Sequence, residues 1–354
     1  MVKNGKLSGI QKIAVVRANA LGDFIFTLPA LEALRMTYPE AEIILLAKAW
    51  HAAFLTGRTS PIERAIIIPP YRGVSTEPEA EEQVEELEHF FACMKRENFD
   101  LALQLHGGGH YSNPFVQQLG ARVTVGLKTP EAVALDRWKP YLYLQSEIAR
   151  YLEVMSLIGV EPVTLDPHIT VMPQDIAESS QLVADTSKAF VVLHPGASDP
   201  RRRWSAAKFA QVGNALLGVG AHVIVTGTED ERAIVEEVVA GTDHRAQSVC
   251  GSLSLNGLTG LLSRCQLVIS NDTGPLHLAC AVGIPTVGIY WAYNILTAGT
   301  LTRNYLRPII TWRMTCPVCN SDNSMQRCEH TISFVDDIAA EEVIANALEL
   351  YTPK

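Results

Sequence analysis

The sequence lacks any apolar run of the roughly 18 to 20 residues that a helix needs to cross a bilayer. Its N-terminus has lysines but no long apolar segment and no plausible cleavage site, so we expect no secretory signal. Positive charge is also in deficit, with 29 Lys and Arg against 38 Asp and Glu and a formal net charge of −9. General nucleic-acid binding needs a basic face and is therefore not expected. We predict a cytoplasmic protein whose positively charged sites are local.

Several common enzyme signatures are absent as well. The chain contains neither G-x-G-x-x-G nor a Walker loop, which argues against a dinucleotide dehydrogenase and a P-loop ATPase. Residues 106–109 read His-Gly-Gly-Gly, as in the oxyanion-hole loop of esterases, but the partner elbow G-x-S-x-G occurs nowhere in the chain. A hydrolase is therefore disfavoured, and we expect the glycines to let a loop lie close to a ligand or to a facing domain.

Cysteine is scarce and odd in number, with seven residues in 354. Four lie scattered among apolar residues, as buried core cysteines do: Cys93, Cys250, Cys265 and Cys280. The other three form a cluster with a histidine near the C-terminus, in the spacing C-x2-C-x8-C-x-H: Cys316, Cys319, Cys328 and His330. This spacing could hold one structural zinc or iron ion, because thiolate clusters suit both metals. The alternative is a reduced surface knuckle without metal, and in neither case do we expect a catalytic role.

The length of 354 residues is too great for one typical domain and suits two, each with its own core. The composition, 47% hydrophobic and 19% charged, is that of a globular enzyme. Prolines at 162, 167 and 173 mark residues 159–173 as the best linker. We predict one domain over residues 1–165 and a second over residues 166–335. An amphipathic helix within 336–354 ends the chain and could pack back on the first domain.

Residues 267–291 contain a strand, a sharp turn, a short helix and a second strand, which together make a βαβ unit of a parallel sheet. The backbone N–H groups that open such a helix are unsatisfied, and Gly274 has no side chain to block a ligand, so the turn can seat a phosphate. His277 would lie near the same anion. The alternative is that Asp272 or Thr273 only caps the helix and that His277 is an ordinary polar residue.

Asp23 stands between the first predicted strand, 12–16, and a predicted helix over 24–38, with a further strand over 42–47. The carboxyl ends of strands in open α/β sheets are where ligands bind and react. A carboxylate at such a position is a candidate general base, although it could also serve only as a helix cap, and the two roles can coexist.

A strand predicted over 190–193 leads into a turn with Ser198, and Arg201, Arg202 and Arg203 follow directly. Arginines beside a small-residue loop in an acidic protein indicate a site for an anion such as a diphosphate. The alternative is a solvated basic patch. From this strand onward the order βαβαβαβ is that of a Rossmann-like domain.

The stretch SNDTGPLH, residues 270–277, closely resembles the nucleotide-sugar signature of glycosyltransferase family 9, the ADP-heptose heptosyltransferases. Three other stretches match the same family in order and at suitable spacing: RANALGDFIFTLP at 17–29, HPGASDPRRRW at 194–204, and the C-terminal cysteine cluster. The four stretches span nearly the whole chain. The resemblance implies the GT-B architecture of the α/β class, in which two Rossmann-like domains with parallel sheets face each other across a cleft.

The resemblance also implies roles for individual residues. The second domain would hold the donor, an ADP-heptose-like nucleotide sugar, through seven residues: Ser198, Arg202, Glu231, Asp272, Thr273, Gly274 and His277. The first domain would hold the acceptor, and Asp23 matches the base proposed for the family. Asn19, His110 and Ser112 are the candidate acceptor contacts. Arg202 stands where the family usually has lysine, which keeps the charge but changes the geometry of phosphate binding.

The resemblance implies a mechanism as well. The acceptor hydroxyl loses its proton to the base as it attacks the anomeric carbon, in a single displacement that inverts this centre. Helix-end N–H groups and arginine carry the charge of the leaving ADP, so no catalytic cofactor is expected. We expect heptose transfer to a glycan or lipid-linked acceptor in lipopolysaccharide core synthesis, peripheral to the cytoplasmic face of the inner membrane. A protein, small-molecule or other glycan acceptor stays open, as do a nucleotide-sugar epimerase or hydrolase and a non-catalytic binding module.

Overall fold

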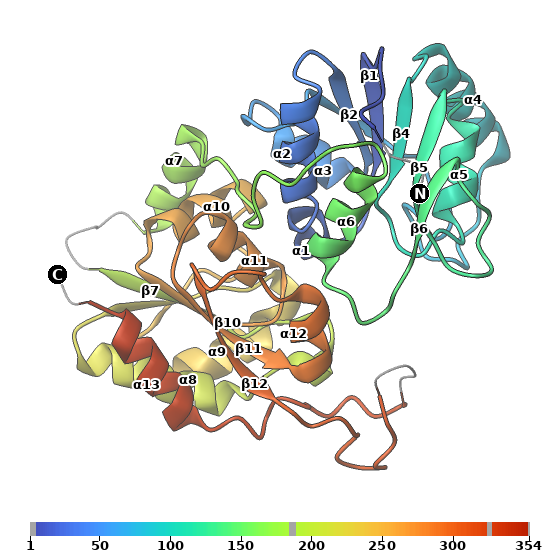
Figure 1. Cartoon of the computed structure of the whole chain (residues 1–354). Coiled ribbons are helices and arrows are strands. Elements are labelled where there is room, and N and C mark those ends of the chain that lie inside the picture. Colours follow the sequence, from blue (N-terminus) through green and yellow to red (C-terminus); the bar gives the residue numbers. More distant parts are fainter. Residues whose placement is uncertain (1–4, 184–188, 324–327, 353–354) are drawn as a thin grey trace. The chain divides into compact units, whose positions relative to one another are not determined.

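The structure, a computed structural model, describes residues 5–183, 189–323 and 328–352 of the chain. The chain divides into two compact units, Met1–Pro167 and His168–Lys354 (Figure 1). Each unit has its own parallel six-stranded sheet with helices between the strands, so the predicted α/β class with two parallel sheets is confirmed. Within the described ranges, no helix is both long and apolar enough to span a membrane.

The sheet of the first unit has the strand order β3-β2-β1-β4-β5-β6, and all neighbouring strands are parallel. Its strands are β1 (Lys12–Val16), β2 (Glu42–Ala47), β3 (Arg64–Ile67), β4 (Leu101–Gln104), β5 (Val123–Lys128) and β6 (Arg137–Pro140). The three central strands are almost entirely buried. They read as continuous apolar runs because helices cover a parallel sheet on both faces.

The sheet of the second unit has the strand order β12-β11-β10-β7-β8-β9, again with parallel neighbours. Its strands are β7 (Phe190–His194), β8 (His222–Val225), β9 (Gln247–Ser248), β10 (Leu267–Asn271), β11 (Thr286–Trp291) and β12 (Leu306–Thr311). Counted from the first strand of its own unit, each sheet therefore has the same order. In both sheets the direction of winding reverses between two central strands, β1 and β4 or β7 and β10, which is the topological switch point.

Helices make the connections between these strands. Those of the first unit are α1 (Leu21–Ile25), α2 (Leu28–Thr37), α3 (Ala49–Leu55), α4 (Val84–Arg96), α5 (Ser112–Gln118) and α6 (Glu147–Ser156). Those of the second unit are α7 (Pro173–Leu182), α8 (Ala206–Gly218), α9 (Arg232–Ala240), α10 (Leu255–Arg264), α11 (Gly274–Ala281), α12 (Ala292–Ala298) and α13 (Ala340–Leu350). Two short 3-10 turns, η1 (Pro200–Arg202) and η2 (Glu229–Glu231), also belong to the second unit.

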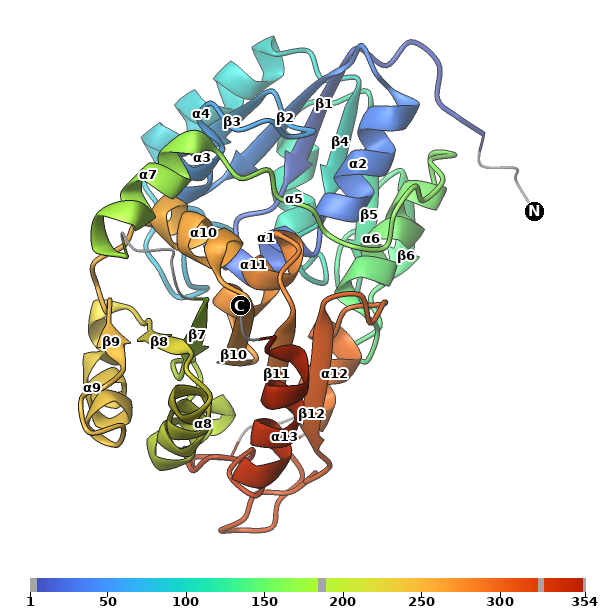
Figure 2. The ribbon, with the colours of Figure 1, turned by 90° about the vertical axis from the view of Figure 1, so that its left-hand side faces the viewer.

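One expectation about helices needs correction. The helix predicted over 24–38 is divided into α1 and α2, since Pro29 has no N–H to extend α1 and instead occupies the first turn of α2. The C-terminal helix α13 packs on α8 (Figure 2), and its apolar residues Val343 and Ala347 are buried in the core of the second unit. One face of this helix is therefore covered within the second unit.

Candidate active site

Each unit brings two loops together at the carboxyl ends of its central strands. In the first unit, Val16 of β1 lies opposite Gln104 of β4. In the second unit, Ser270 of β10 lies opposite His194 of β7. Ligands of open α/β sheets bind at such ends, because the two connections leave in opposite directions and open a crevice. The predicted site residues lie in these four loops or directly after them, apart from Glu231, which follows β8.

Asp23 lies in α1, and its side chain is 36% exposed. One carboxylate oxygen, Oδ1, is 3.1 Å from Nη2 of Arg17, and Oδ2 accepts a hydrogen bond of 3.2 Å from the backbone N–H of Ala20. The helix cap and the accessible carboxylate, which the sequence analysis allowed to coexist, are therefore present together. Asp23 is held at two points and can still accept a proton from a ligand.

Arg17 is the residue that positions Asp23, and no role was expected for it from the sequence. Its guanidinium is buried and donates to the backbone oxygens of Asp23 at 3.0 Å and Leu105 at 2.6 Å, and to the Tyr151 hydroxyl at 2.6 Å. Burial raises the pKa of Tyr151 to about 12, so this hydroxyl stays protonated. Glu147 Oε2, at 3.7 Å, supplies a further negative charge. An arginine directly after a buried apolar strand was the signal that could have revealed it, because a buried charge needs partners.

The three predicted acceptor contacts have different surroundings. His110 is exposed. Ser112 is buried, and its hydroxyl donates to the backbone oxygen of His106 at 2.7 Å and accepts from Gln104 Nε2 at 2.6 Å. These bonds shape the loop after β4, so we assign the Ser112 hydroxyl to the structure of that loop. Asn19 is partly buried, and its Oδ1 has no hydrogen-bond partner among the residues that the structure describes.

A cavity of about 450 Å³ opens beside the loop after β4. Glycine backbone and aromatic rings make up much of its wall: residues 107–109, His110, Tyr111, Tyr141 and Tyr143. Among the described residues that line it, Glu131 carries the only formal charge. Gly109 has a φ of 93°, and a Cβ there would lie 2.4 Å from Asn113 Nδ2, so a larger residue would be strained and would clash. The glycines thus shape a hollow, as a ligand-binding loop requires.

In the second unit, the turn after β10 forms a buried charged cluster around Asp272. The Asp272 side chain is 2% exposed, with Oδ1 3.1 Å from His277 Nε2 and Oδ2 2.6 Å from Asn294 Nδ2 and 3.3 Å from Arg202 Nη1. Burial by itself would raise the pKa of Asp272, but His277, Arg202 and Asn294 outweigh it and hold the pKa below its usual value. Asp272, predicted as a donor contact, is therefore an ionised, buried anchor that orients Arg202 and His277.

The three consecutive arginines have three different environments. Arg202 has a side chain that is 24% exposed, and its Nη2 donates to Ser198 Oγ at 3.1 Å. Arg203 donates from Nε to a backbone oxygen of its own loop at 2.8 Å. Arg201 is buried and forms an ion pair with Asp199 at 2.6 Å. The tract is thus not a solvated basic patch, and one of its guanidiniums, that of Arg202, reaches the turn after β10.

Asn271 joins the two motifs of the second unit. Its Nδ2 donates to the backbone oxygen of Pro195 at 2.7 Å, and its Oδ1 accepts from the backbone N–H of Trp204 at 3.1 Å. Thr273 and Gly274 follow and open α11, and no side-chain hydrogen bond caps this helix at Thr273. The N-terminus of α11 therefore retains the backbone donors and the partial positive charge that suit an anion.

Glu231, the predicted nucleoside contact, lies in η2 and is brought to the loop after β7. It accepts a hydrogen bond of 2.9 Å from the backbone N–H of Thr228 and lies 4.0 Å from His194 Nε2. Burial lowers the pKa of His194 even though the charge of Glu231 acts in the other direction. A Cβ at Gly196 would lie 2.0 Å from Glu231 Oε1, so glycine is what allows this loop to pass the carboxylate.

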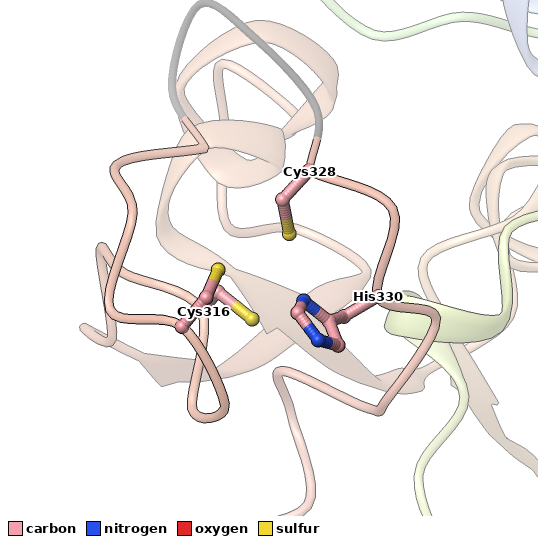
Figure 3. Close-up of side chains that lie close together, drawn as sticks. Cys316, Cys328 and His330 are labelled. Carbon is pink, nitrogen blue, oxygen red and sulfur yellow. The ribbon is translucent and has the colours of Figure 1, made fainter.

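The cysteine cluster predicted from spacing is assembled in the structure. The candidate ligand atoms of Cys316, Cys319, Cys328 and His330 all lie within 4.8 Å of one another. Figure 3 shows the side chains of Cys316, Cys328 and His330 close together. Burial would raise the pKa of Cys328, but hydrogen bonds with His330 and Asn323 lower it to about 6. A thiolate is the form of cysteine that binds metal. Three sulfurs and one imidazole nitrogen at this separation fit a structural zinc or iron ion.

Comparisons with known proteins agree with this geometry. The family model for glycosyltransferase family 9 (heptosyltransferase) matches residues 88–319. Lipopolysaccharide heptosyltransferase 3 of Escherichia coli is 24% identical over 283 residues, which are 77% of this chain and 81% of that protein. A family 9 glycosyltransferase of Veillonella parvula superposes with a TM-score of 0.77 at 20% identity, covering 96% of this chain and 97% of its own. The E. coli ADP-heptose lps heptosyltransferase II superposes with a TM-score of 0.75 at 17% identity, covering 96% and 98%.

One more solved structure bears on the cysteine cluster. The iron-containing dodecameric glycosyltransferase TibC of enterotoxigenic E. coli has a TM-score of 0.55 at 12% identity, covering 98% of this chain and 77% of its own. These structural likenesses establish the shared fold, and the family model covers more than half of this sequence. The chain therefore belongs to glycosyltransferase family 9 (heptosyltransferase) and is a glycosyltransferase.

Proposed function

We propose that this enzyme transfers heptose from ADP-heptose to a hydroxyl group of an acceptor, with inversion at the anomeric carbon. The observation that carries the proposal is the cluster at the start of α11, where Arg202 lies beside the backbone of Asp272 and the opening residues Thr273 and Gly274. A helix N-terminus and a guanidinium together form a site for a diphosphate. The likeness of the fold to the E. coli ADP-heptose lps heptosyltransferase II supports ADP-heptose as the donor.

In this proposal the second domain, residues 166–335, holds the donor, and the first domain, residues 1–165, holds the acceptor. The division of the chain into two compact units supports these limits. The diphosphate sits on the N–H groups that open α11, with Arg202 and Ser198 on its oxygens. Asp272 does not contact the donor itself and instead orients Arg202. His277 faces the diphosphate or the sugar, and Glu231 contacts the nucleoside.

Asp23 supplies the base. Its carboxylate takes the proton of the acceptor hydroxyl while the acceptor oxygen attacks the anomeric carbon and the bond from that carbon to the ADP oxygen breaks. A positioned base contributes roughly 10² to 10⁴ in rate. The leaving ADP gains negative charge, which Arg202 and the N-terminus of α11 stabilise, so these steps require no metal or organic cofactor.

We propose the lipopolysaccharide core as the acceptor, by analogy with the heptosyltransferases of E. coli, at the cytoplasmic face of the inner membrane. Asn19 and His110 are the proposed direct contacts, with Ser112 acting through the loop after β4. The cavity beside this loop also favours a second candidate. Because its walls are aromatic and Glu131 is the one formal charge among the described lining residues, it also suits an uncharged glycan, protein or small-molecule acceptor.

Incubation of the purified enzyme with ADP-heptose and a panel of acceptors tests these assignments. Transfer to a core-type lipid is expected, and transfer only to a protein, a small molecule or another glycan would replace that acceptor. Release of ADP or epimerisation of the sugar at full rate without any acceptor would point to a hydrolase or epimerase instead. Binding of ADP-heptose without turnover under any condition would leave a non-catalytic binding module.

We also propose that the cysteine cluster holds a structural zinc or iron ion through Cys316, Cys319, Cys328 and His330. The mutual distances of the ligand atoms support this site, and the iron-containing relative supports iron as one of the two metals. Elemental analysis of the purified chain by mass spectrometry tests it, with one metal atom per chain expected. Replacement of Cys328 by serine should lower the metal content, and an unchanged content would exclude this ligand set.

A further inference from the structure

The cysteine knuckle, residues 314–323 and 328–330, lies against the arginine loop, residues 198–203. A cavity of about 440 Å³ has walls from both segments, with Arg202 on the side of the loop and Cys328 on the side of the knuckle. The knuckle is therefore next to the proposed donor site, although the reaction as derived above uses neither its sulfurs nor its imidazole. Because both segments line one cavity, the conformation of the knuckle can affect that of the arginine loop.

Arg201 connects the two segments. Its buried guanidinium donates from Nε and Nη2 to the Asp199 carboxylate at 3.0 and 2.6 Å, and from Nη1 to Asn323 Oδ1 at 3.4 Å. Its backbone oxygen accepts a hydrogen bond of 2.8 Å from the N–H of Phe334. A two-pronged arginine–carboxylate pair has a fixed geometry. Asp199 belongs to the arginine loop itself, so the contacts of Arg201 with Asn323 and Phe334 are the ones described here that tie this loop to the later segment.

Asn323 is itself held by the knuckle. Its Oδ1 accepts a hydrogen bond of 3.0 Å from the backbone N–H of Cys328, and its Nδ2 donates to the backbone oxygen of Ser321 at 3.0 Å. The same Ser321 oxygen accepts from the backbone N–H of Cys316 at 2.9 Å. Two hydrogen bonds thus connect Cys328, which carries one of the candidate ligand atoms, to the guanidinium of Arg201.

The knuckle has almost no core of its own. Among its described residues only Cys316 and Asn323 are buried, and the rest are exposed or partly exposed. Small segments of this kind are held in shape by their metal, because the free energy of metal binding is then folding free energy. Of the described knuckle residues, Cys316 lies in the core of the second unit and Cys328 packs against it. Without metal, the hydrogen bonds that reach Arg201 would depend on a segment held by little apolar packing beyond these two residues.

We propose that a metal ion in the knuckle fixes the arginine loop and thereby sets the affinity of the enzyme for the donor diphosphate. The ligand residues hold Asn323, Asn323 holds Arg201, and Arg201 sets the position of Arg202, which binds the diphosphate. Arg201 is a positioning residue in this scheme and does not touch the donor. The inference rests on the proposed donor site at the start of α11.

ADP serves as the probe, and its binding to the full chain is measured by isothermal titration calorimetry. The chain is compared as the metal-loaded form, after chelation, and after Zn²⁺ or Fe²⁺ is added back. Affinity for ADP should fall about tenfold on chelation, within the range of about 5- to 150-fold that is typical of coupled sites, and should return with metal. An unchanged affinity at zero metal content would overturn the coupling, as would a chain that takes up no metal at all.

Two variants separate the coupling from simple loss of the metal. Arg201→Ala should keep one metal per chain but weaken ADP binding by a similar factor, and chelation of this variant should add little, because both changes break the same chain of contacts. If Arg201→Ala and chelation each lower the affinity for ADP independently, so that the two factors multiply, the scheme is contradicted. Cys93→Ser, which removes a cysteine from α4 of the first unit, is the matched control and should keep both metal content and ADP affinity.

A second readout does not depend on the donor. Trypsin cleaves after arginine, so cleavage within the arginine loop should become several-fold faster when the metal is removed, while circular dichroism shows that the sheets remain folded. If the loaded chain binds no ADP but this cleavage still responds to metal, the donor assignment fails and the link between knuckle and loop stands. If cleavage is the same with and without metal, the link itself is wrong.

Discussion

The two units of this enzyme have the same strand order, and each has one arginine–carboxylate pair at the carboxyl ends of its central strands. The burial of the two partners is reversed. In the first unit Arg17 is buried at 1% exposure, and its partner Asp23 is 36% exposed. In the second unit the carboxylate of Asp272 is buried at 2% exposure, and its partner Arg202 is 24% exposed. One unit therefore exposes a carboxylate at this position, and the other exposes a guanidinium.

In such a pair, the exposed partner decides which ligand chemistry the pair can perform. An exposed carboxylate held by a buried cation can accept a proton, whereas an exposed guanidinium held by a buried anion can bind a phosphate. The buried partner positions the other one and is satisfied by further hydrogen bonds: Arg17 by Leu105 and Tyr151, and Asp272 by Asn294 and His277. The fold supplies the position, and the local pattern of burial supplies the chemistry.

Of the replacements considered, Asp23→Asn should cause the largest loss, and the loss should be in the rate of transfer. The amide keeps the shape of the side chain but cannot accept the proton, so we expect kcat to fall by roughly 10² to 10⁴ while ADP binds as before. Steady-state transfer rates and calorimetry with ADP measure the two quantities. Glu153→Gln, at an exposed carboxylate on α6, is the control and should leave both unchanged. Full turnover by the Asp23→Asn enzyme would remove Asp23 as the base.

Replacement of Asp272 by alanine tests the buried side of the second pair. Loss of a buried carboxylate leaves Arg202 without its counter-charge and His277 without its hydrogen-bond partner on Asp272, so the free energy of unfolding should fall by about 3 to 5 kcal/mol. Denaturant unfolding followed by the fluorescence of Trp204 and Trp291, both buried in the second unit, measures the loss. Asp23→Ala should cost less, because Asp23 is partly exposed and Arg17 keeps its other partners. A larger loss of unfolding free energy for Asp23→Ala than for Asp272→Ala would contradict the reversed burial of the two pairs.

Replacement of Arg202 tests the exposed side of the same pair. Hydrogen bonds to charged groups contribute about 1.5 to 3 kcal/mol, so Arg202→Ala should weaken ADP binding by roughly 10- to 150-fold. Arg202→Lys keeps the charge without the fork and should lose less. Arg203→Ala is the matched control within the same run of arginines, since its guanidinium bonds to the backbone of its own loop. Equal losses for the alanine variants at 202 and 203 would mean that no single arginine carries the site.

The smallest expected effect is on the pH dependence of stability. The folded state holds the pKa of Asp272 below its ordinary value of 3.8, so its ionised form contributes stability above about pH 4, and this contribution is lost as the pH falls through the folded pKa. Thermal unfolding between pH 5 and pH 3 measures the loss. Asp272→Asn should be less sensitive to acid than the parent chain over this interval. If the midpoint temperatures of the two proteins fall equally with pH, the surroundings of Asp272 do not lower its pKa.

The strands were predictable from the sequence where apolar runs are bounded by turn residues. The predicted strands over 12–16 and 42–47 coincide with β1 and β2, because a strand covered on both faces leaves a continuous apolar signal. The edge strand β12 was missed, since it contains Pro308, and a proline removes a ladder hydrogen bond and weakens the strand pattern. A parallel edge strand tolerates that loss on its open side.

The candidate site was predictable to the level of motifs. The stretch with Asp272 and His277, the arginines that begin at Arg201, and the spacing of the cysteines all stood out, because turn chemistry, charge and ligand spacing are local in sequence. Which arginine reaches the turn was not predictable. Arg201 and Arg203 bond to Asp199 and Ala197 of their own loop, whereas Arg202 reaches Asp272, which is 70 positions away in the chain.

By itself, the sequence determined the α/β class, the succession of βαβ units, the family, and which loops carry polar side chains, because each of these depends on residues close together in the chain. Only the tertiary structure decided which partner of each ion pair is buried. Arg17 and Tyr151 are 134 positions apart, and Arg202 and Asp272 are 70 apart. Exposure depends on what packs over a side chain, and for these pairs the covering residues come from distant segments.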